Sequence, residues 1–181
     1  MRAFLGISIS NELKPKILAI QKRFSSFDIK FVEPDNLHFN LKFFREIRNE
    51  EIDKLKQILG EISEKFEPFE IEIKGIGAFP SKNYIRVVWL GVKEGYNIIT
   101  TLAETIQDSI EVLGFLKEGR FKPHLTLGRV RTARNKENLR SLIEELSDIE
   151  IGKMKVEKVI LFKSKLSPTG PIYEEVFGTD L

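Results

Sequence analysis

Two stretches, His124-Leu125-Thr126-Leu127-Gly128 and its partial echo His38-Phe39-Asn40-Leu41, contain the only histidines of this 181-residue chain. Each histidine opens the same pattern of histidine, apolar residue, hydroxyl or amide residue, and leucine. Because successive side chains of a strand point to opposite faces, the first and third residues of each motif would share one face. If the two strands lie side by side, two imidazoles and two hydrogen-bond donors meet in one site.

The spacing of the motifs indicates an internal duplication. They are 124 − 38 = 86 positions apart, close to half the chain, and an amphipathic helical pattern follows each motif within a few residues. No linker rich in Gly, Pro or Ser separates the halves. We therefore expect one domain, residues 1–181, with two lobes related by a pseudo-twofold axis. The predicted fold is α+β, with antiparallel sheets, helices packed outside and a central cleft between the motif strands.

Hydrophobic periodicity places the individual elements. Apolar residues at helical spacing predict helices over about 11–24, 49–66, 96–113 and 136–146. Extended patterns predict strands over about 2–9, 30–32, 38–44, 69–73, 84–92, 121–131, 154–162 and 172–177, with a bend over 75–80.

Composition describes an ordinary globular protein, 41% hydrophobic and 31% charged. The absence of cysteine excludes disulfides, a thiol nucleophile and cysteine-ligated metals, which agrees with a reducing cytoplasm. The first residues are too soon polar for a signal peptide, and no apolar run approaches the roughly 20 residues of a membrane span. We expect a cytoplasmic monomer without a membrane partner.

Positive charge concentrates around the second motif. Residues 115–136 hold seven basic residues and one acid, a net charge of +6, so the rest of the chain sums to −4. A local positive field at a candidate site favours an anionic ligand, above all phosphate. The alternative is a solvated basic strand and loop without function.

Alternation along the first motif strand adds two candidates. It places Lys42 and Phe44 on the same face as His38 and Asn40. A lysine and an aromatic ring there would suit a phosphate and a nucleotide base. Phe44 is equally well explained as a core residue at the strand's end, and both interpretations stay open.

Two histidines beside a phosphate suit general acid–base catalysis, because an imidazole titrates near pH ~6.5. One neutral ring accepts a proton from the attacking hydroxyl and one protonated ring donates to the leaving oxygen, each worth about 10²–10⁴-fold in rate. Thr126 and Asn40 would donate hydrogen bonds to the phosphate oxygens. Neither histidine has a partner at metal-ligand spacing, and no nucleotide-triphosphate loop is present, so we expect no metal, ATP or other cofactor.

These motifs and their flanks resemble the two-histidine (2H) phosphoesterase superfamily, and within it the archaeal and bacterial RNA 2′,3′-cyclic phosphodiesterases, also called 2′-5′ RNA ligases. The resemblance covers nearly the whole chain. It implies hydrolysis of an RNA 2′,3′-cyclic phosphate end to a 2′-phosphomonoester. Beside the two motifs, it is carried by Met1-Arg2-Ala3-Phe4, Phe31-Val32-Glu33, Gly75-Ile76-Gly77-Ala78-Phe79-Pro80, Arg86-Val87-Val88-Trp89 and Gly170-Pro171-Ile172-Tyr173-Glu174.

The resemblance assigns roles to individual positions. His38 and His124 match the catalytic histidines, Thr126 matches a phosphate-binding threonine, and Arg129 matches an arginine beside the phosphate. Simple alternation points Arg129 away from His124. It reaches the site only if the strand ends or bulges at Gly128.

One departure from the family pattern affects the site. Asn40 stands where the first motif normally has Thr or Ser, so we expect weaker or altered activity. Two alternatives to hydrolysis stay open. One is ATP-independent 2′-5′ ligation by the same residues, and the other is a catalytically weakened protein that binds RNA ends.

Overall fold

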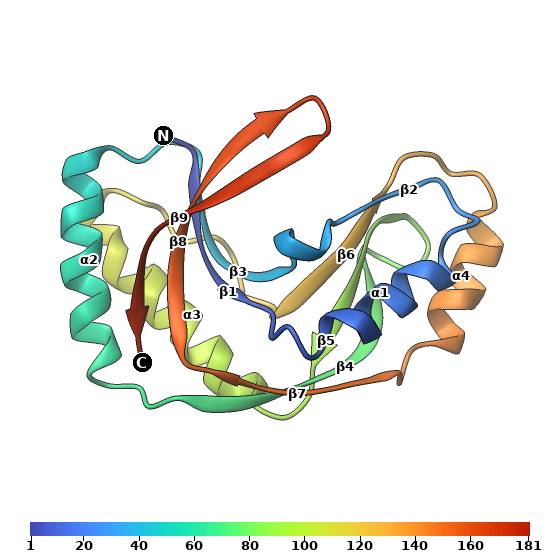
Figure 1. Ribbon diagram of the computed structural model, residues 1–181, viewed down its shortest axis with the longest axis horizontal. Coiled ribbons are helices and arrows are strands. Elements are labelled where there is room, and N and C mark those ends of the chain that lie inside the picture. The colour runs from blue at the N-terminus through green and yellow to red at the C-terminus, as the bar shows by residue number, and fades with distance from the viewer.

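The two motif strands, β3 (His38–Phe44) and β6 (His124–Val130), lie next to each other in the middle of one nine-stranded sheet. The computed structural model describes all residues, 1–181. The strand order is β7-β4-β5-β6-β3-β1-β8-β9, with β2 paired to β6, and all pairs are antiparallel. Four α-helices lie on the outside of the sheet, two at either end of the molecule (Figure 1).

The elements have the following bounds. The remaining strands are β1 (Ala3–Ser8), β2 (Ile29–Phe31), β4 (Phe69–Pro80), β5 (Ile85–Val92), β7 (Glu150–Val156), β8 (Lys158–Ser167) and β9 (Gly170–Asp180). The helices are α1 (Lys14–Arg23), α2 (Asn49–Ser63), α3 (Tyr96–Ser109) and α4 (Lys136–Glu145), with short 3₁₀ turns η1 (Pro34–Asn36) and η2 (Ile110–Leu113).

The sheet consists of two lobes that meet at β3 and β6, and each lobe contains strands from both halves of the sequence. Outward from this junction the first lobe contains β3, β1, β8 and β9, and the second contains β6, β5, β4 and β7. Helices α2 and α3 flank the first lobe, and α1 and α4 the second (Figure 1). The α+β fold with two related halves and outer helices is therefore confirmed. The lobes share one continuous sheet, joined by a single backbone bridge between Phe39 and Leu125.

The first helix of each sequence half lies in the opposite lobe from the motif strand of that half. Helix α1, which follows β1, contacts β6 of the second lobe, and α3, which follows β5, contacts β3 of the first lobe. Each motif strand is thus supported from behind by a helix of the other sequence half.

One core of 39 buried apolar residues runs behind the whole sheet. The helical stripes expected from the sequence are part of it, including Ile17 and Ile20 of α1, Leu55 and Leu59 of α2, and Ile99, Leu102 and Ile106 of α3. Fully burying such a side chain contributes about 1.5–3 kcal/mol. No helix of the structure is both long enough and apolar enough to cross a membrane.

Two expected elements differ from the structure. The strand predicted over 154–162 is two strands, β7 and β8, separated at Glu157. The bend predicted over 75–80 is instead a continuation of β4, which pairs with β5 as far as Pro80. Gly75 adopts a φ of 83°, and the register shifts between Ile73 and Ile76, so the irregularity is absorbed as a bulge within the strand.

Candidate active site

The bridge between β3 and β6 determines how the two motifs face each other. Phe39 lies opposite Leu125, and both side chains are completely buried. Continuing this register places His38 opposite Thr126 and Asn40 opposite His124. All four share the face away from the core, and the histidines are diagonal neighbours, about 7–8 Å apart at the backbone. This separation allows one phosphate group to contact both rings.

Both imidazoles are held by the same hydrogen bond. The Nδ1 of His38 lies 2.6 Å from the carbonyl oxygen of Asn36, and the Nδ1 of His124 lies 2.7 Å from that of Lys122. A carbonyl oxygen only accepts, so each Nδ1 carries a proton and donates. Each Nε2 is therefore left for a ligand: it accepts a proton when the ring is neutral and donates one when the ring is charged.

Aromatic rings fix the orientation of each imidazole. His38 lies against Phe4, with ring centroids 4.4 Å apart, and meets the edge of Tyr173 at 5.4 Å. His124 meets Phe79 at 4.8 Å and Trp89 at 6.2 Å. Each histidine thus has little rotational freedom, which keeps its Nε2 in a defined place.

The surroundings lower the pKa of both imidazoles. Burial is the main cause for His38; the hydrogen bond to Asn36 opposes it, and the charge of His124 adds to it. For His124, burial again lowers the pKa most, the hydrogen bond to the Lys122 carbonyl opposes it, and the charges of Lys122 and Arg129 lower it further. Burial also raises the pKa of the Tyr173 hydroxyl, and the charges of Arg129 and Arg2 partly offset that effect.

The histidines open into a cleft of about 1140 Å³ between the lobes. Five basic side chains line it against two acidic ones, so the cleft is positively charged. No cluster of three or more His, Asp or Glu side chains that could hold a metal ion is found. The charged lining residues are Arg2, Lys30, Arg120, Lys122 and Arg129, with Glu33 and Glu118.

The tip of the β8–β9 hairpin borders this cleft and contacts the segment before β3. The ammonium group of Lys30 donates to the Thr169 carbonyl oxygen at 2.9 Å. The side-chain amide of Asn36 donates to the Pro171 carbonyl oxygen, also at 2.9 Å. The hairpin projects from the first lobe beyond the sheet (Figure 1) and contributes Tyr173 to the cleft wall.

Each motif strand contains a β-bulge three residues after its histidine. Along β3, Asn40 pairs with Gly6 and Lys42 with Leu5, so Leu41 has no partner on β1. Along β6, the register shift between Val88 and Trp89 of β5 likewise leaves Leu127 without a partner. A bulge inserts one residue and reverses the alternation of all side chains that follow.

The bulges decide which later side chains reach the cleft. Arg129 lines the cleft because the bulge at Leu127 precedes it, one residue before Gly128, where a bulge was predicted to be needed. At the equivalent place on β3, Phe43 lines the cleft, with the guanidinium of Arg2 4.9 Å from its ring centroid.

The face predicted for Lys42 and Phe44 is wrong. Both lie on the core side of β3, with 4% and 1% of their surface exposed, and neither lines the cleft. The bulge at Leu41, invisible to simple alternation, turns them inward. Phe44 packs against Phe115 at 4.8 Å, which matches the core interpretation of this residue.

The other predicted site residues come together in one cleft: His38, Asn40, His124, Thr126 and Arg129. Four further residues that were not predicted for the site also line the cleft: Arg2, Lys30, Phe43 and Tyr173. Arg2 and Tyr173 lie in stretches that carry the family resemblance, but no local pattern marks any of the four as a site residue, because they come from separate segments that meet only through the sheet order.

Comparison with known proteins agrees with this two-fold construction. The sequence family described as LigT like Phosphoesterase matches the chain twice, over residues 7–89 and 90–173. The chain belongs to the LigT-like, two-histidine phosphoesterase family. Each matched half contains one histidine motif, so the family unit is the half, and each of the two copies contributes one histidine to the cleft.

Curated relatives and solved structures extend over nearly the full chain. The RNA 2′,3′-cyclic phosphodiesterases of Methanothermobacter thermautotrophicus and Methanocaldococcus jannaschii are 41% and 40% identical, covering 97% of this chain and 96% and 98% of their own. A Thermus thermophilus crystal structure matches with a TM-score of 0.83 at 26% identity, covering 100% of this chain and 98% of that one. E. coli LigT complexed with 3′-AMP shares the fold, with a TM-score of 0.81 at 23% identity over 99% and 97%.

Proposed function

We propose that this protein is an enzyme that opens 2′,3′-cyclic phosphates at RNA 3′ ends and releases 2′-phosphomonoester ends. The observation that carries the proposal is the pair of matched imidazoles, each with Nδ1 bound to a carbonyl and Nε2 left for a ligand, on adjacent strands of a cationic cleft. The curated archaeal relatives bear the name of this activity.

The reaction balances with the residues present. The neutral imidazole takes a proton from water at its Nε2 as the water oxygen bonds to phosphorus. The bond from phosphorus to the ribose O3′ breaks, and the protonated imidazole gives its Nε2 proton to that oxygen. The two rings end with exchanged protonation states, which solvent restores. Which of His38 and His124 acts as the acid is decided by the orientation of the bound ribose.

We assign phosphate binding to three further side chains. Thr126 and Asn40 lie opposite the two histidines, and Arg129 follows on the same cleft face. Hydroxyl, amide and guanidinium groups donate hydrogen bonds to the non-bridging oxygens, where negative charge builds up in the transition state. Asn40 Oδ1 is buried without a hydrogen-bond partner, and because a carbonyl oxygen only accepts, donation to the phosphate falls to the Nδ2 amide group.

The charge coupling of the histidines supports their division of labour. A charged His124 lowers the pKa of His38, so the pair takes up its second proton at a lower pH than its first. Between these two steps one ring carries a proton on Nε2 and the other does not, which is the state that acid–base catalysis uses. Because both histidines come from one chain, we also propose that the protein works as a monomer. We place its activity in the cytoplasm as part of the same proposal.

The test uses 2′,3′-cyclic AMP and a short RNA with a 2′,3′-cyclic phosphate end, with products identified by ³¹P NMR. We expect a 2′-phosphate product, and a loss of turnover of at least about 10²-fold in His38→Ala and in His124→Ala. Gln57→Ala, an exposed change on α2, serves as the control. Unchanged turnover in either histidine variant, or tight binding of the RNA without any turnover by the natural protein, contradicts the proposal.

The same RNA separates hydrolysis from ligation. With a 5′-hydroxyl RNA acceptor added, that hydroxyl replaces water as the attacking group and the same histidines act on it. We expect hydrolysis to dominate, because water is far more concentrated than any acceptor. A 2′-5′-linked product that exceeds the hydrolysis product would make ligation the principal activity.

A further inference from the structure

Two buried glutamines occupy equivalent positions in the two halves. Gln21 lies in α1 and Gln107 in α3, and their spacing of 107 − 21 = 86 equals that of the two histidines. Only 6% and 2% of their surfaces are exposed, and apart from Lys42 they are the only buried polar residues of the chain. Gln21 does not line the cleft, and Gln107 borders it with its amide already bonded to the backbone, so the proposed chemistry leaves both without a role.

Gln21 joins the segment that leads to one histidine to the bulge that follows the other. Its Nε2 donates to the carbonyl oxygen of Val32 at 3.0 Å and to that of Leu127 at 3.0 Å. Val32 comes six residues before His38, and Leu127 is the bulged residue three after His124. The backbone amide of Val32 also donates to the Leu127 oxygen, so the two segments are tied at one point.

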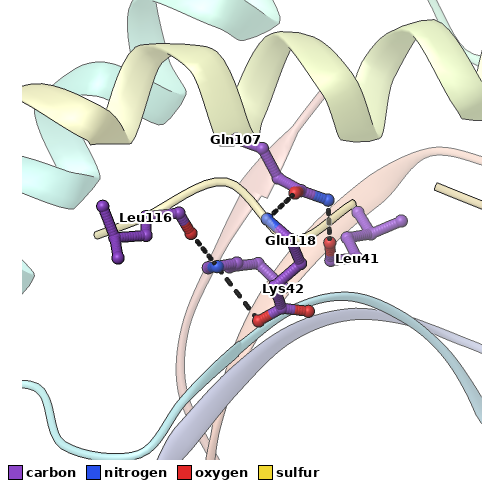
Figure 2. Close-up of polar contacts among 5 residues, drawn as sticks. All are labelled: Leu41, Lys42, Gln107, Leu116 and Glu118. Carbon is purple, nitrogen blue, oxygen red and sulfur yellow. Dashed lines mark hydrogen bonds and ion pairs between the residues drawn. The ribbon is translucent and has the colours of Figure 1, made fainter. Parts of the chain in front are cut away.

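Gln107 makes the equivalent connection in the opposite sense. Its Nε2 donates to the carbonyl oxygen of Leu41 at 3.2 Å, and its Oε1 accepts from the backbone amide of Glu118 at 3.1 Å (Figure 2). Glu118 comes six residues before His124, and Leu41 is the bulged residue three after His38. Each glutamine therefore links the approach to its own half's histidine with the bulge of the other half.

Lys42 strengthens the second connection. Its buried ammonium group donates to the Leu116 carbonyl oxygen at 2.7 Å and pairs with the Glu118 carboxylate at 3.0 Å (Figure 2). The segment ending at Glu118 is thus attached to β3 through both Gln107 and Lys42. This attachment explains why a lysine that cannot reach the cleft is buried beside the motif.

These links matter because the motif strands otherwise share very little. The ladder between β3 and β6 has one bridge, and each bulge leaves its strand without regular pairing at the residue concerned. Catalysis by two imidazoles requires their Nε2 atoms to be held at the correct distance from one phosphorus atom, and small misplacements are costly. Two directional hydrogen-bonding side chains at the bulges supply that constraint, which apolar packing alone does not.

We propose that Gln21 and Gln107 are positioning residues that set the separation and orientation of His38 and His124 across the junction of the lobes. Each acts through the hydrogen bonds that join a bulge to an approach segment. The kinetic part of this inference rests on the proposed function, whereas the structural part concerns the histidines themselves.

The test replaces each glutamine by methionine, which has a similar shape but forms no comparable hydrogen bonds. For Gln21→Met and Gln107→Met we expect kcat on 2′,3′-cyclic AMP to fall about 10- to 100-fold, with KM within about threefold. Leu59→Met, at a buried position of α2, is the control for methionine in a helix interior. If the methionine variants do not fold, Gln21→Asn and Gln107→Asn replace them in the test, because they keep the amide on a side chain that is one methylene shorter.

An NMR measurement separates positioning from general destabilisation. The chain has two histidines, so the two imidazole signals can be assigned with His38→Ala and followed through a pH titration. We expect each glutamine variant, and not Leu59→Met, to change the interval between the two titration steps. Titrations and kcat that match the natural protein, or a kcat loss no larger than that of an equally destabilised control, overturn the proposal. Altered titrations in a protein without cyclic phosphodiesterase activity would uphold positioning and refute the proposed function instead.

Discussion

At the scale of single residues, the two histidines are equivalent in their own hydrogen bonds but not in their electrostatic surroundings. Each Nδ1 donates to the carbonyl oxygen two residues upstream. His124 alone is close enough to Lys122 and Arg129 for their charges to lower its pKa, whereas His38 responds to His124. The asymmetry comes from the residues that differ between the two motifs, since the backbone geometry is repeated.

The pH dependence of catalysis follows from these directions. Both imidazoles have a pKa below the ordinary value of about 6.5, so the free enzyme loses its catalytic proton below that pH. We expect kcat/KM for 2′,3′-cyclic AMP to be bell-shaped, with the falling limb below pH ~6.5 because both pKa values are lowered. Lys122→Gln removes a charge that lowers the pKa of His124, so one limb of the bell moves to higher pH. Lys155→Gln, far from the cleft, is the control, and an unmoved profile in Lys122→Gln contradicts the assignment.

The unusual residue of the first motif gives a second prediction. Asn40 faces the cleft with a planar carboxamide, where the family pattern has a shorter hydroxyl side chain. We expect Asn40→Thr to raise kcat by roughly tenfold, because the hydroxyl follows the phosphate oxygen more closely during the reaction. Asn40→Val, which has no donor, should lower kcat below that of the natural protein. Steady-state rates of cyclic-phosphate hydrolysis measure both, and equal rates for all three proteins would show that this position takes no part.

At the scale of elements, the bulges decide which side chains of each motif strand serve the cleft and which serve the core. On β3, Phe43 lies in the cleft wall beside Arg2, and its neighbour Phe44 is buried against Phe115. On β6, the same irregularity brings Arg129 into the cleft. An unbulged strand would have exchanged these positions.

Substitution of the two neighbouring phenylalanines tests the bulge directly. Phe44→Leu should lower the free energy of unfolding by about 1–2 kcal/mol, because it leaves unfilled volume in the core, and should change KM little. Phe43→Leu should have the smaller effect on stability but raise KM for a cyclic nucleotide, because it removes part of the cleft wall. Urea denaturation and steady-state kinetics of both variants decide the matter. The reverse pattern would mean that β3 alternates without a bulge.

At the scale of the whole molecule, the cleft has a charge that the protein as a whole does not share. The net charge of the chain is only +2, yet five basic side chains line the cleft against two acidic ones. One of the two acids, Glu118, is already paired with the buried Lys42. The five basic residues come from separate segments around the cleft, so the positive field extends beyond the histidines.

This charge predicts a dependence on salt that differs between substrates. A short RNA places several phosphates in the cationic cleft, whereas 2′,3′-cyclic AMP places one. Each phosphate neutralised contributes a slope of about −0.7 to the logarithm of affinity against the logarithm of salt concentration. We therefore expect KM for a six-nucleotide RNA to rise more than twice as steeply with KCl as KM for 2′,3′-cyclic AMP. Parallel slopes would confine recognition to the terminal phosphate.

The sequence by itself determined the repeat, the helices, most strands and four residues of the cleft (His38, Asn40, His124 and Thr126), because histidine spacing, period-2 alternation and helical stripes are local signals. Only the tertiary structure decided the faces of Lys42, Phe44 and Arg129, since a bulge depends on which strand pairs with which. The same holds for Arg2 and Tyr173, which reach the site through the sheet order. The glutamines lie between these cases. Their spacing of 86 was readable in the chain, but their role appears only where helices of one half meet the bulged strands of the other.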